Sequence, residues 1–259
     1  MRRLTGRTAV VTGASRGIGR AIAERLAADG ALVAVHYGSN QAAADETVAT
    51  IQRAGGSAFA VGAELGDDQG VDALFAGLDE GLSGRPLDIL VNNAAVPPAG
   101  PIDSSTPEEF DRIFAVNVKA PFFVIQRAIP RMSGRGRIIT ISSVATRMAN
   151  PTQTSFAMAK GAVETMSFTL ANELGARGIT VNAVAPGATK TDVNAALFEQ
   201  PPGFEAYLAS MTALDRLGRA DDIADAVAFL ASDDGRWVTG HVLDVSGGIH
   251  LGPRVPSRT

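Results

Sequence analysis

Short apolar runs alternate with longer amphipathic stretches along the 259 residues of the chain. Runs such as Ala9-Val10-Val11 and Ile138-Ile139 place apolar side chains at consecutive positions, which is typical of parallel strands covered on both faces. Between these runs the apolar residues recur every three to four positions, which indicates amphipathic helices. The pattern predicts strands over Thr8–Thr12, Leu32–His36, Ser57–Val61, Ile89–Asn92, Arg137–Ile141, Ile179–Ala183 and His241–Val245, and helices near 17–29, 40–54, 67–80, 107–131, 153–175 and 221–232.

Two helix starts carry their own signals. Thr106-Pro107-Glu108-Glu109 reads as a capping box with proline in the first turn, and Asp221-Asp222 places carboxylates where a helix dipole favours them. Repeated strand–helix–strand units predict an α/β fold, a single Rossmann-type doubly wound parallel sheet with helices on both faces. We expect one domain over residues 1–251 and a flexible tail over 252–259, with the ligand beyond the carboxyl ends of the strands.

Composition narrows the possible chemistry. The net charge of -4 argues against nucleic-acid binding, and no apolar run approaches the roughly 18 residues that span a bilayer, so we expect a cytoplasmic protein that binds neither nucleic acid nor membrane. There is no cysteine, which excludes a thiolate nucleophile, and the three histidines form no metal-type pair. Only Tyr37 and Tyr207 can supply a phenolic proton.

A glycine-rich turn follows the first expected strand. Glycines at 13, 17 and 19 stand between that strand and the next helix, where they permit a tight turn and close approach of a phosphate. A plain strand-to-helix turn needs only one glycine, so three favour a dinucleotide pyrophosphate site. The candidate contacts in this turn are Gly13, Ser15, Arg16, Gly17, Ile18 and Gly19.

The end of the second expected strand bears on the choice of cofactor. It reads His36-Tyr37-Gly38-Ser39-Asn40 and lacks the carboxylate that holds the ribose 2′-hydroxyl of NAD. Arg16 can face a 2′-phosphate, to which Ser39 and Asn40 can donate hydrogen bonds, so the sequence favours NADP(H). Alternatively Arg16 is a solvated cation and Ser39-Asn40 caps the next helix, although capping and phosphate binding can coexist.

Further motifs carry a resemblance to a known family. They are Asn92-Asn93-Ala94-Ala95 after the fourth strand, Asn117, Ser142-Ser143, Lys160, and Pro186-Gly187 followed by Thr191. Together with the Gly-x-x-x-Gly-x-Gly turn, they make residues 5–250 resemble the short-chain dehydrogenases/reductases, especially the ketoacyl-carrier-protein reductase-like branch. The resemblance implies further cofactor contacts at Tyr37, Glu64, Asn92, Lys160, Pro186, Gly187, Thr189 and Thr191.

The resemblance also implies the reaction, which is hydride transfer between a nicotinamide and a carbonyl/alcohol pair. Its catalytic positions fall on Asn117, Ser143, residue 156 and Lys160. In the family, residue 156 is a tyrosine that donates the proton, the lysine lowers its pKa, the serine polarises the substrate oxygen, and the asparagine anchors a water. Here residue 156 is Phe156, which cannot donate a proton.

Three accounts of Phe156 fit the sequence. It is an engineered change in an ordinary reductase, or it is natural and the proton comes from water, substrate or a side chain such as Tyr207, or the domain binds ligand without catalysis. We expect an NADPH-dependent ketone reductase, impaired or unusual because of Phe156, with a silent NADP(H)-binding or ligand-sensing domain as the alternative. Loss of a positioned general acid typically costs about 10²–10⁴ in rate.

The segment 192–211 resembles the family's variable substrate lid. Its apolar residues suggest a moderately large, greasy carbonyl substrate, and single residues there can equally pack the lid on the core. The family resemblance implies a homotetramer or homodimer, formed through the helices that hold Asn117 and Lys160 and through the strand near Gly240–Gly248. The lid contains Phe198, Pro201-Pro202-Gly203, Phe204, Tyr207, Leu208 and Met211.

Overall fold

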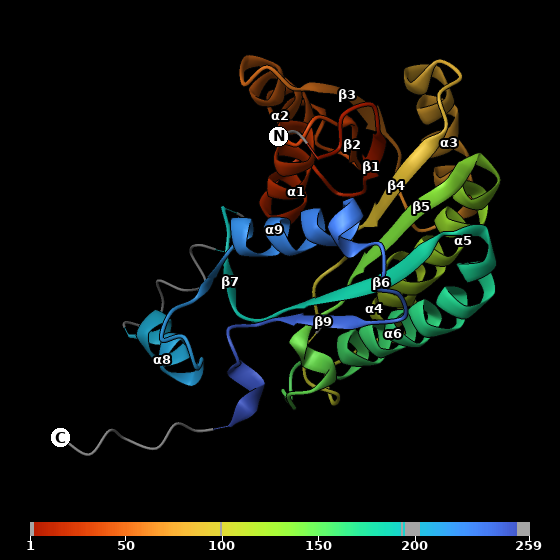
Figure 1. The fold of residues 1–259 in the computed structure, drawn as a ribbon. Helices are drawn as coiled ribbons and strands as arrows, with labels where there is room; N and C mark the ends of the chain where they lie inside the picture. The colour runs from red at the N-terminus through yellow and green to blue at the C-terminus, as the bar shows by residue number, and fades with distance from the viewer. Residues whose placement is uncertain (1–2, 99, 193, 195–202, 253–259) are drawn as a thin grey trace.

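A seven-stranded parallel sheet organises the computed structural model, which describes residues 3–98, 100–192, 194 and 203–252 (Figure 1). The strand order is β3-β2-β1-β4-β5-β6-β9, so the predicted doubly wound α/β fold is confirmed. The strands are β1 Thr8–Val11, β2 Leu32–Tyr37, β3 Ser57–Gly62, β4 Leu87–Asn92, β5 Met132–Ile141, β6 Thr180–Pro186 and β9 Val242–Val245.

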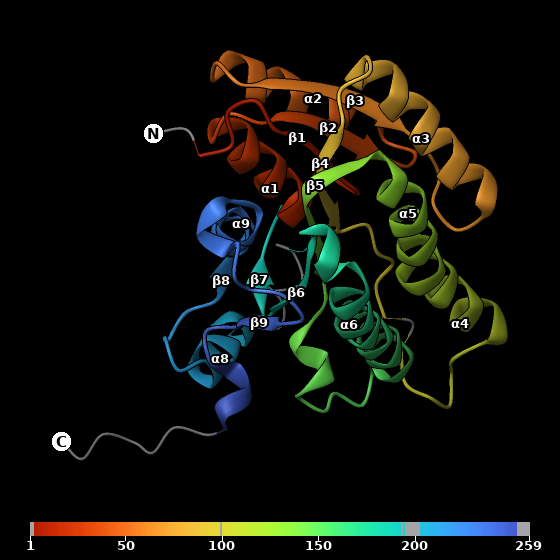
Figure 2. The ribbon, with the colours of Figure 1, turned by 45° about the vertical axis from the view of Figure 1, so that its right-hand side comes forward.

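Helices cover both faces of the sheet, as Figure 2 shows. The helices α1, α2 and α9 pack on one face through residues such as Ile22, Ile51 and Val227, and α3, α5 and α6 pack on the other through Leu74 and Val124. This double cover explains why the strands are apolar at consecutive positions. The helices are α1 Gly17–Ala28, α2 Gln41–Arg53, α3 Asp68–Leu82, α4 Pro107–Phe114, α5 Ala120–Ala128, α6 Thr154–Leu174, α8 Phe204–Met211 and α9 Ala220–Ala231.

The strand order reverses beside β1. The chain runs outward from β1 through β2 to β3, and β4 then pairs with the other edge of β1. At such a switch point the loops after the strands separate and leave a crevice at the carboxyl ends. The glycine turn after β1 and the segment after β4 therefore lie next to each other.

The predicted helix over 107–131 is corrected by the structure. It divides into α4, a π-helical turn at Ala115–Lys119, α5, and a 3-10 turn at Ile129–Arg131. Pro121 supplies the physical reason, because it has no N–H to donate to the carbonyl of Asn117 four residues earlier, and its ring crowds that carbonyl. The π turn that results contains Asn117, and such turns often mark functional positions.

The predicted capping box at the amino end of α4 agrees with the structure. Thr106 and Glu109 form it, with Glu109 N–H donating to Thr106 Oγ1 at 3.2 Å and Thr106 N–H donating to Glu109 Oε2 at 3.0 Å.

Two short strands and a helix lie where we predicted no element. They are the paired strands β7 Thr189–Lys190 and β8 Gly218–Arg219, and the helix α8. No helix in the described part of the chain is long and apolar enough to cross a membrane.

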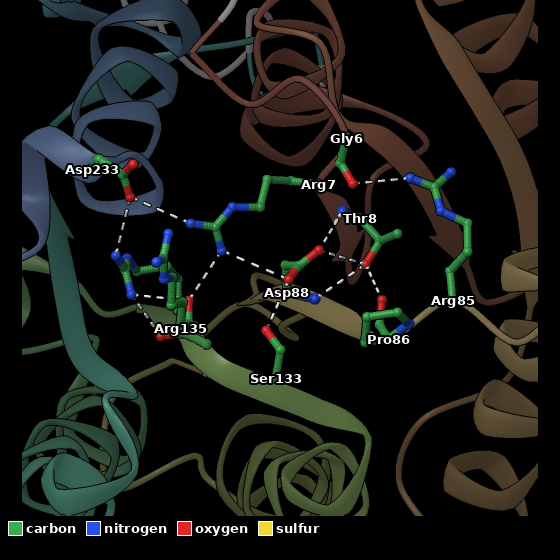
Figure 3. Close-up of polar contacts among 11 residues, drawn as sticks. Gly6, Arg7, Thr8, Arg85, Pro86, Asp88, Ser133, Arg135 and Asp233 are labelled. Atoms are coloured by element: carbon green, nitrogen blue, oxygen red, sulfur yellow. Dashed lines mark hydrogen bonds and ion pairs between the residues drawn. The ribbon is translucent and has the colours of Figure 1, made fainter.

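A polar cluster ties the amino ends of the strands together (Figure 3). Asp88 at the start of β4 accepts hydrogen bonds from Thr8 N–H and from Ser133 Oγ, each at 3.0 Å, and so links three neighbouring strands. Arg7 lies 3.6 Å from Asp88 and 3.3 Å from Asp233. Since ligands of such sheets bind at the carboxyl ends, we assign this cluster to stability.

Candidate functional site

The glycine turn has a backbone that only glycine accommodates. Gly13 and Gly17 have φ values of +62° and +59°, in the left-handed region that disfavours side chains. A Cβ on Gly13 would lie 2.9 Å from Ala94 Cα, and a Cβ on Gly19 would overlap Gly13 O and the Asn93 side chain. The turn therefore brings the amino end of α1 against the segment after β4.

Two side chains that the sequence analysis did not single out hold this turn. Asn93 Nδ2 donates to Thr12 O at 2.8 Å and to Gly13 O at 3.1 Å. His36 is buried on β2, where Nδ1 accepts Gly13 N–H at 3.0 Å and Nε2–H donates to Ala63 O at 2.9 Å. Burial lowers the pKa of His36 to about 4, so the ring stays neutral and keeps Nδ1 as an acceptor.

Asn92, for which the resemblance implies a cofactor contact, is buried at the end of β4. Its Nδ2 is closed to solvent and has no hydrogen-bond partner among the described residues. The hydrogen bonds to the glycine turn come from the neighbouring Asn93. A cofactor contact through the Asn92 side chain therefore stays a prediction.

The groups expected at a ribose phosphate lie at the ends of β1, β2 and β3. Arg16 is exposed, and no carboxylate of the described chain lies within ion-pair distance of its guanidinium. Ser39 and Asn40 are exposed, and Asn40 Oδ1 accepts Ala43 N–H at 3.0 Å, so the capping alternative is confirmed. Glu64 is exposed after β3. These positions leave Arg16 open to an anionic ligand.

A carboxylate approaches the pyrophosphate end of the turn. Asp192 Oδ1 accepts Gly17 N–H, the first amide of α1, at 2.9 Å. That amide belongs to a helix amino end, which attracts anions. Asp192 is exposed and stands at the start of the expected lid, so the lid and the cradle meet through this hydrogen bond. The contact joins residues 175 positions apart, and we did not predict it.

Lys160 is buried in α6, with 5% of its surface exposed. Its Nζ donates to Ile141 O at the end of β5, at 2.8 Å. Burial lowers the pKa of the ammonium to about 8, because the charged form is desolvated. The Lys160 amine, at the carboxyl end of β5, therefore gains and loses its proton close to neutral pH.

Phe156 lies one helical turn before Lys160 on α6. The Lys160 Nζ is 5.4 Å from the centre of the Phe156 ring, a cation–π distance. The structure therefore places the ring beside the lysine, at the position that the resemblance gives to a tyrosine. The two tyrosines of the chain lie elsewhere, since Tyr37 ends β2 and packs over Gly62, and Tyr207 on α8 is 59% exposed.

Ser143 stands at the corner that follows β5. Its Oγ accepts Ala145 N–H at 3.1 Å and starts a 3-10 turn at Val144–Thr146. Asn117 is buried, and its side chain pairs with Val96, accepting N–H at 2.8 Å and donating to the carbonyl at 3.1 Å. Both the Ser143 corner and the π turn around Asn117 pack against α6, so the structure gathers the four expected catalytic positions around one helix.

The segment after β6 forms the remaining wall. Gly187 lies so close to Ser246 that an added Cβ would be 2.8 Å from Ser246 Cα, which explains the glycine. Thr189 Oγ1 donates to Gly187 O at 3.1 Å, and Thr191 Oγ1 donates to Asn194 Oδ1 at 3.0 Å. Both threonines therefore make loop hydrogen bonds. The predictions for Phe198, for Pro201 and Pro202, and for 253–259 lie outside the described residues.

The site as a whole fits an organic cofactor. Within the ranges described, no group of three His, Cys, Asp or Glu side chains could hold a metal ion. The open glycine cradle and the exposed Arg16 offer backbone donors and positive charge to a phosphorylated ligand.

Comparison with known proteins decides the family. The family model described as Enoyl-(Acyl carrier protein) reductase matches residues 13–250. The chain belongs to the short-chain dehydrogenase/reductase family. The resemblance inferred from the glycine turn, Ser143 and Lys160 is thereby confirmed. An uncharacterized oxidoreductase of Methylorubrum extorquens, another member, is 47% identical over 252 residues, which are 96% of this chain and 100% of that protein.

Solved structures of short-chain dehydrogenases/reductases are also similar. An angucycline C-6 ketoreductase, LanV, with bound NADP, shares 52% identity at a TM-score of 0.92 and covers 96% of this chain and 98% of its own. LugOII, described as a promiscuous reductase that catalyses keto-reduction at C1 during lugdunomycin biosynthesis, shares 54% identity at a TM-score of 0.92, over 96% and 100%. Both likenesses extend over nearly the whole length of each chain.

The residues that sequence reasoning missed in this family member share one property. His36, Asn93 and Asp192 each contact a backbone group of the glycine turn or of the amino end of α1. Each contact depends on a strand or loop far away in the sequence. A local signal existed only for Asn93, which adjoins Asn92 in the quoted motif.

Proposed function

We propose that this short-chain dehydrogenase/reductase reduces a ketone to a secondary alcohol with NADPH. The observation that carries the proposal is Lys160, a buried amine bonded to the end of β5, directly beside the Ser143 corner. Such an amine stabilises the negative charge that develops on a carbonyl oxygen during reduction. The high identity to ketoreductases over nearly the full length supports the same reaction.

NADP(H) is the cofactor that the proposal requires. Gly13, Gly17 and Gly19 would admit its pyrophosphate, and Arg16 would face its 2′-phosphate at a place where β2 ends without a carboxylate. When bound, the nicotinamide supplies the hydride. The LanV structure contains bound NADP, which supports NADP(H) over NAD(H). The roles of Tyr37, Ser39, Glu64, Thr189 and Thr191 toward the cofactor stay predictions.

Phe156 defines how the chain would handle the proton. Reduction of a ketone by NADPH consumes one proton, which ends on the new hydroxyl group. A phenyl ring cannot donate it, so water beside Lys160 and Ser143 would have to supply it. We propose a slow reductase in which Ser143 donates a hydrogen bond to the carbonyl oxygen and Lys160 stabilises its charge.

The substrate class that we propose is a polycyclic aromatic ketone. The two similar structures are an angucycline C-6 ketoreductase and a reductase that acts at C1 during lugdunomycin biosynthesis, and each shares more than half of its residues with this chain. A trihydroxynaphthalene reductase of Colletotrichum orbiculare, 37% identical over 94% of this chain, is named for a fused-ring aromatic compound. On α8, within the expected lid, Phe204 and Tyr207 stack with ring centres 6.5 Å apart and offer a flat apolar surface. We propose 192–211 as that lid, within one domain that spans 1–251.

A silent NADP(H)-binding or ligand-sensing domain is the second candidate. The observation that favours it is the phenyl ring of Phe156 at 5.4 Å from Lys160, where the family resemblance implies a hydroxyl. In that case the cradle would bind the cofactor, and a ligand would be recognised without turnover.

One experiment separates the two candidates. NADPH binding is measured by fluorescence, and NADPH oxidation is followed with a panel of tetracyclic, bicyclic and aliphatic ketones, for the chain with Phe156 and for Phe156→Tyr. Slow oxidation with an aromatic ketone that rises in Phe156→Tyr supports the reductase. Binding of NADPH without oxidation in either protein replaces it with the silent binding domain.

We also propose that copies of the chain associate into a homodimer or homotetramer. Apolar side chains are exposed on the helices around the expected catalytic positions, among them Phe122 on α5 (48%) and Phe168 on α6 (50%). Trp237, shortly before β9, is 96% exposed. Clusters of exposed large apolar residues are typical of association surfaces. Sedimentation that finds a monomer at micromolar concentration would refute the assembly.

A further inference from the structure

The face of α6 that carries Phe156 and Lys160 also carries Glu164. Glu164 stands one turn after Lys160, at the four-residue spacing that aligns side chains along a helix. It is half-buried, and it was not among the residues that the sequence analysis assigned. Its neighbours connect it to the corner that carries Ser143.

Two hydroxyl groups of that corner donate to one oxygen of Glu164. Ser142 Oγ lies 2.6 Å from Glu164 Oε1, and Thr146 Oγ1 lies 3.0 Å from the same atom. Ser142 precedes Ser143 and Thr146 follows it by three residues, so the carboxylate spans the corner from both sides. Thr146 Oγ1 is also 3.0 Å from Ser143 O, so its single proton is shared between the Glu164 carboxylate and the carbonyl of Ser143 itself.

The other anchors of the corner lie on its strand side. Ser142 N–H donates to Val184 O at 2.7 Å, which continues the β5–β6 pairing, and Lys160 Nζ donates to Ile141 O. These bonds fix the residues up to Ser142, and Arg147, which follows the corner, donates to Asp244 Oδ2 at 3.1 Å and to Val242 O at 3.4 Å on β9. Beyond that point the side chain of Glu164 supplies the link between the corner and α6, and bonds to an ionised acceptor are shorter and stronger than neutral ones.

The absence of a counter-ion strengthens the case. Among the residues that the structure describes, no Lys, Arg or His nitrogen lies within 4.0 Å of the Glu164 carboxylate. A partly desolvated carboxylate without a cation costs stability unless hydrogen bonds compensate for the lost water. The hydroxyls of Ser142 and Thr146 are the compensating groups here, so the carboxylate and the corner depend on each other.

We propose that Glu164 is a positioning residue that sets the place of the Ser143 hydroxyl by holding Ser142 and Thr146. It touches neither cofactor nor substrate and acts through the corner. The inference rests on the proposed ketone reduction, in which Ser143 Oγ meets the carbonyl oxygen. A displacement of about 1 Å in such a group can cost about 10² in rate.

The first test is independent of turnover. The chain has no cysteine, so Ser143→Cys introduces a single thiol as a reporter of the corner. Its rate of reaction with a water-soluble aromatic disulfide is measured alone and combined with Glu164→Ala, Glu164→Gln or Glu173→Ala. Glu173 is an exposed carboxylate on the same helix and serves as the matched control.

We expect the thiol to react about fivefold or more faster with Glu164→Ala, because the corner loses its tie to α6. Glu164→Gln keeps an acceptor oxygen for the two hydroxyls, so it stays within about twofold of the parent, as does Glu173→Ala. Equal thiol reactivity in all four proteins, each shown to be folded by its thermal transition, would overturn the proposal.

The second test is kinetic and uses whichever protein turns over ketone, the chain with Phe156 or Phe156→Tyr. We expect Glu164→Ala to lower kcat by about 10–10² with the KM for NADPH unchanged, and Glu164→Gln to restore most of the rate. In a Ser143→Ala background, Glu164→Ala should have little further effect, because the group that it positions is gone. Additive losses would refute an action through Ser143.

The two tests separate the two proposals. If neither protein oxidises NADPH with any ketone while the thiol rates change as expected, then the proposed reduction fails and the positioning by Glu164 stands. If ketone reduction is observed but the Glu164 variants change neither the thiol rates nor kcat, then the positioning role of Glu164 is refuted and the proposed reduction stands.

Discussion

Restoring a hydroxyl at residue 156 is the perturbation that tests the site most directly. In Phe156→Tyr the ring keeps its place beside Lys160, whose Nζ lies 5.4 Å from the centre of the Phe156 ring. The added phenol would stand next to a buried ammonium, which favours the phenolate and lowers the pKa of the phenol. The change therefore adds a positioned general acid without altering the cofactor cradle.

The magnitude follows from the role of that acid. A positioned general acid contributes about 10²–10⁴ in rate, which corresponds to about 3–5.5 kcal/mol of barrier at 1.36 kcal/mol per decade. The aromatic ring is retained, so the cation–π contact with Lys160 changes little. We therefore expect kcat for ketone reduction to rise by at least about 10², while the dissociation constant of NADPH stays within about threefold.

The assay is NADPH oxidation at saturating cofactor with the best ketone of the panel. Phe229→Tyr is the matched control, because it adds the same hydroxyl to an exposed phenylalanine on α9, which packs on the other face of the sheet. The control should leave kcat unchanged. A folded Phe156→Tyr that binds NADPH and gains no activity would show that the reaction does not use an acid at this position.

Further predictions concern charge at the site and at the opposite edge of the sheet. Burial lowers the folded-state pKa of Lys160 to about 8 from 10.5, so the buried charge destabilises the fold fully below pH 8 and this cost is lost as pH rises to 10.5. The free energy of unfolding should therefore rise by about 3 kcal/mol between pH 8 and 10.5, and urea denaturation of Lys160→Met should show no such rise. Asp192→Asn should tighten NADPH binding about three- to tenfold in fluorescence titration, because a negative charge leaves the first amide of α1, and unchanged affinity would contradict the contact. Arg16→Glu should weaken NADPH binding far more than NADH binding, and equal losses would argue against a 2′-phosphate contact. Asp88→Ala should lower the free energy of unfolding by about 1–3 kcal/mol, since it leaves the buried Thr8 amide without an acceptor, and its NADPH affinity should not change.

Much of the fold could be read locally. Consecutive apolar residues in β1, β4 and β6 reflect burial on both faces, and each strand of the seven-stranded sheet overlaps its predicted range, although β5 begins at Met132, before the predicted Arg137. The capping box at Thr106 uses residues three positions apart, so the sequence displays it completely. The π turn at Asn117 was missed although its cause, Pro121, is local, because apolar spacing over 107–131 continues across the break.

The amino-acid sequence by itself determined the order of strands and helices, the glycine turn and the positions of Phe156 and Lys160, because each depends on neighbours within a few residues. Tertiary structure alone decided which side chains hold that machinery. Asn93 reaches the glycine turn across 80 residues, Asp192 reaches α1 across 175, and Glu164 meets Ser142 only where α6 packs beside the end of β5. A hydrogen bond depends on distance in space to within about 0.5 Å, and spacing along the chain fixes that distance only inside a single helix, strand or turn.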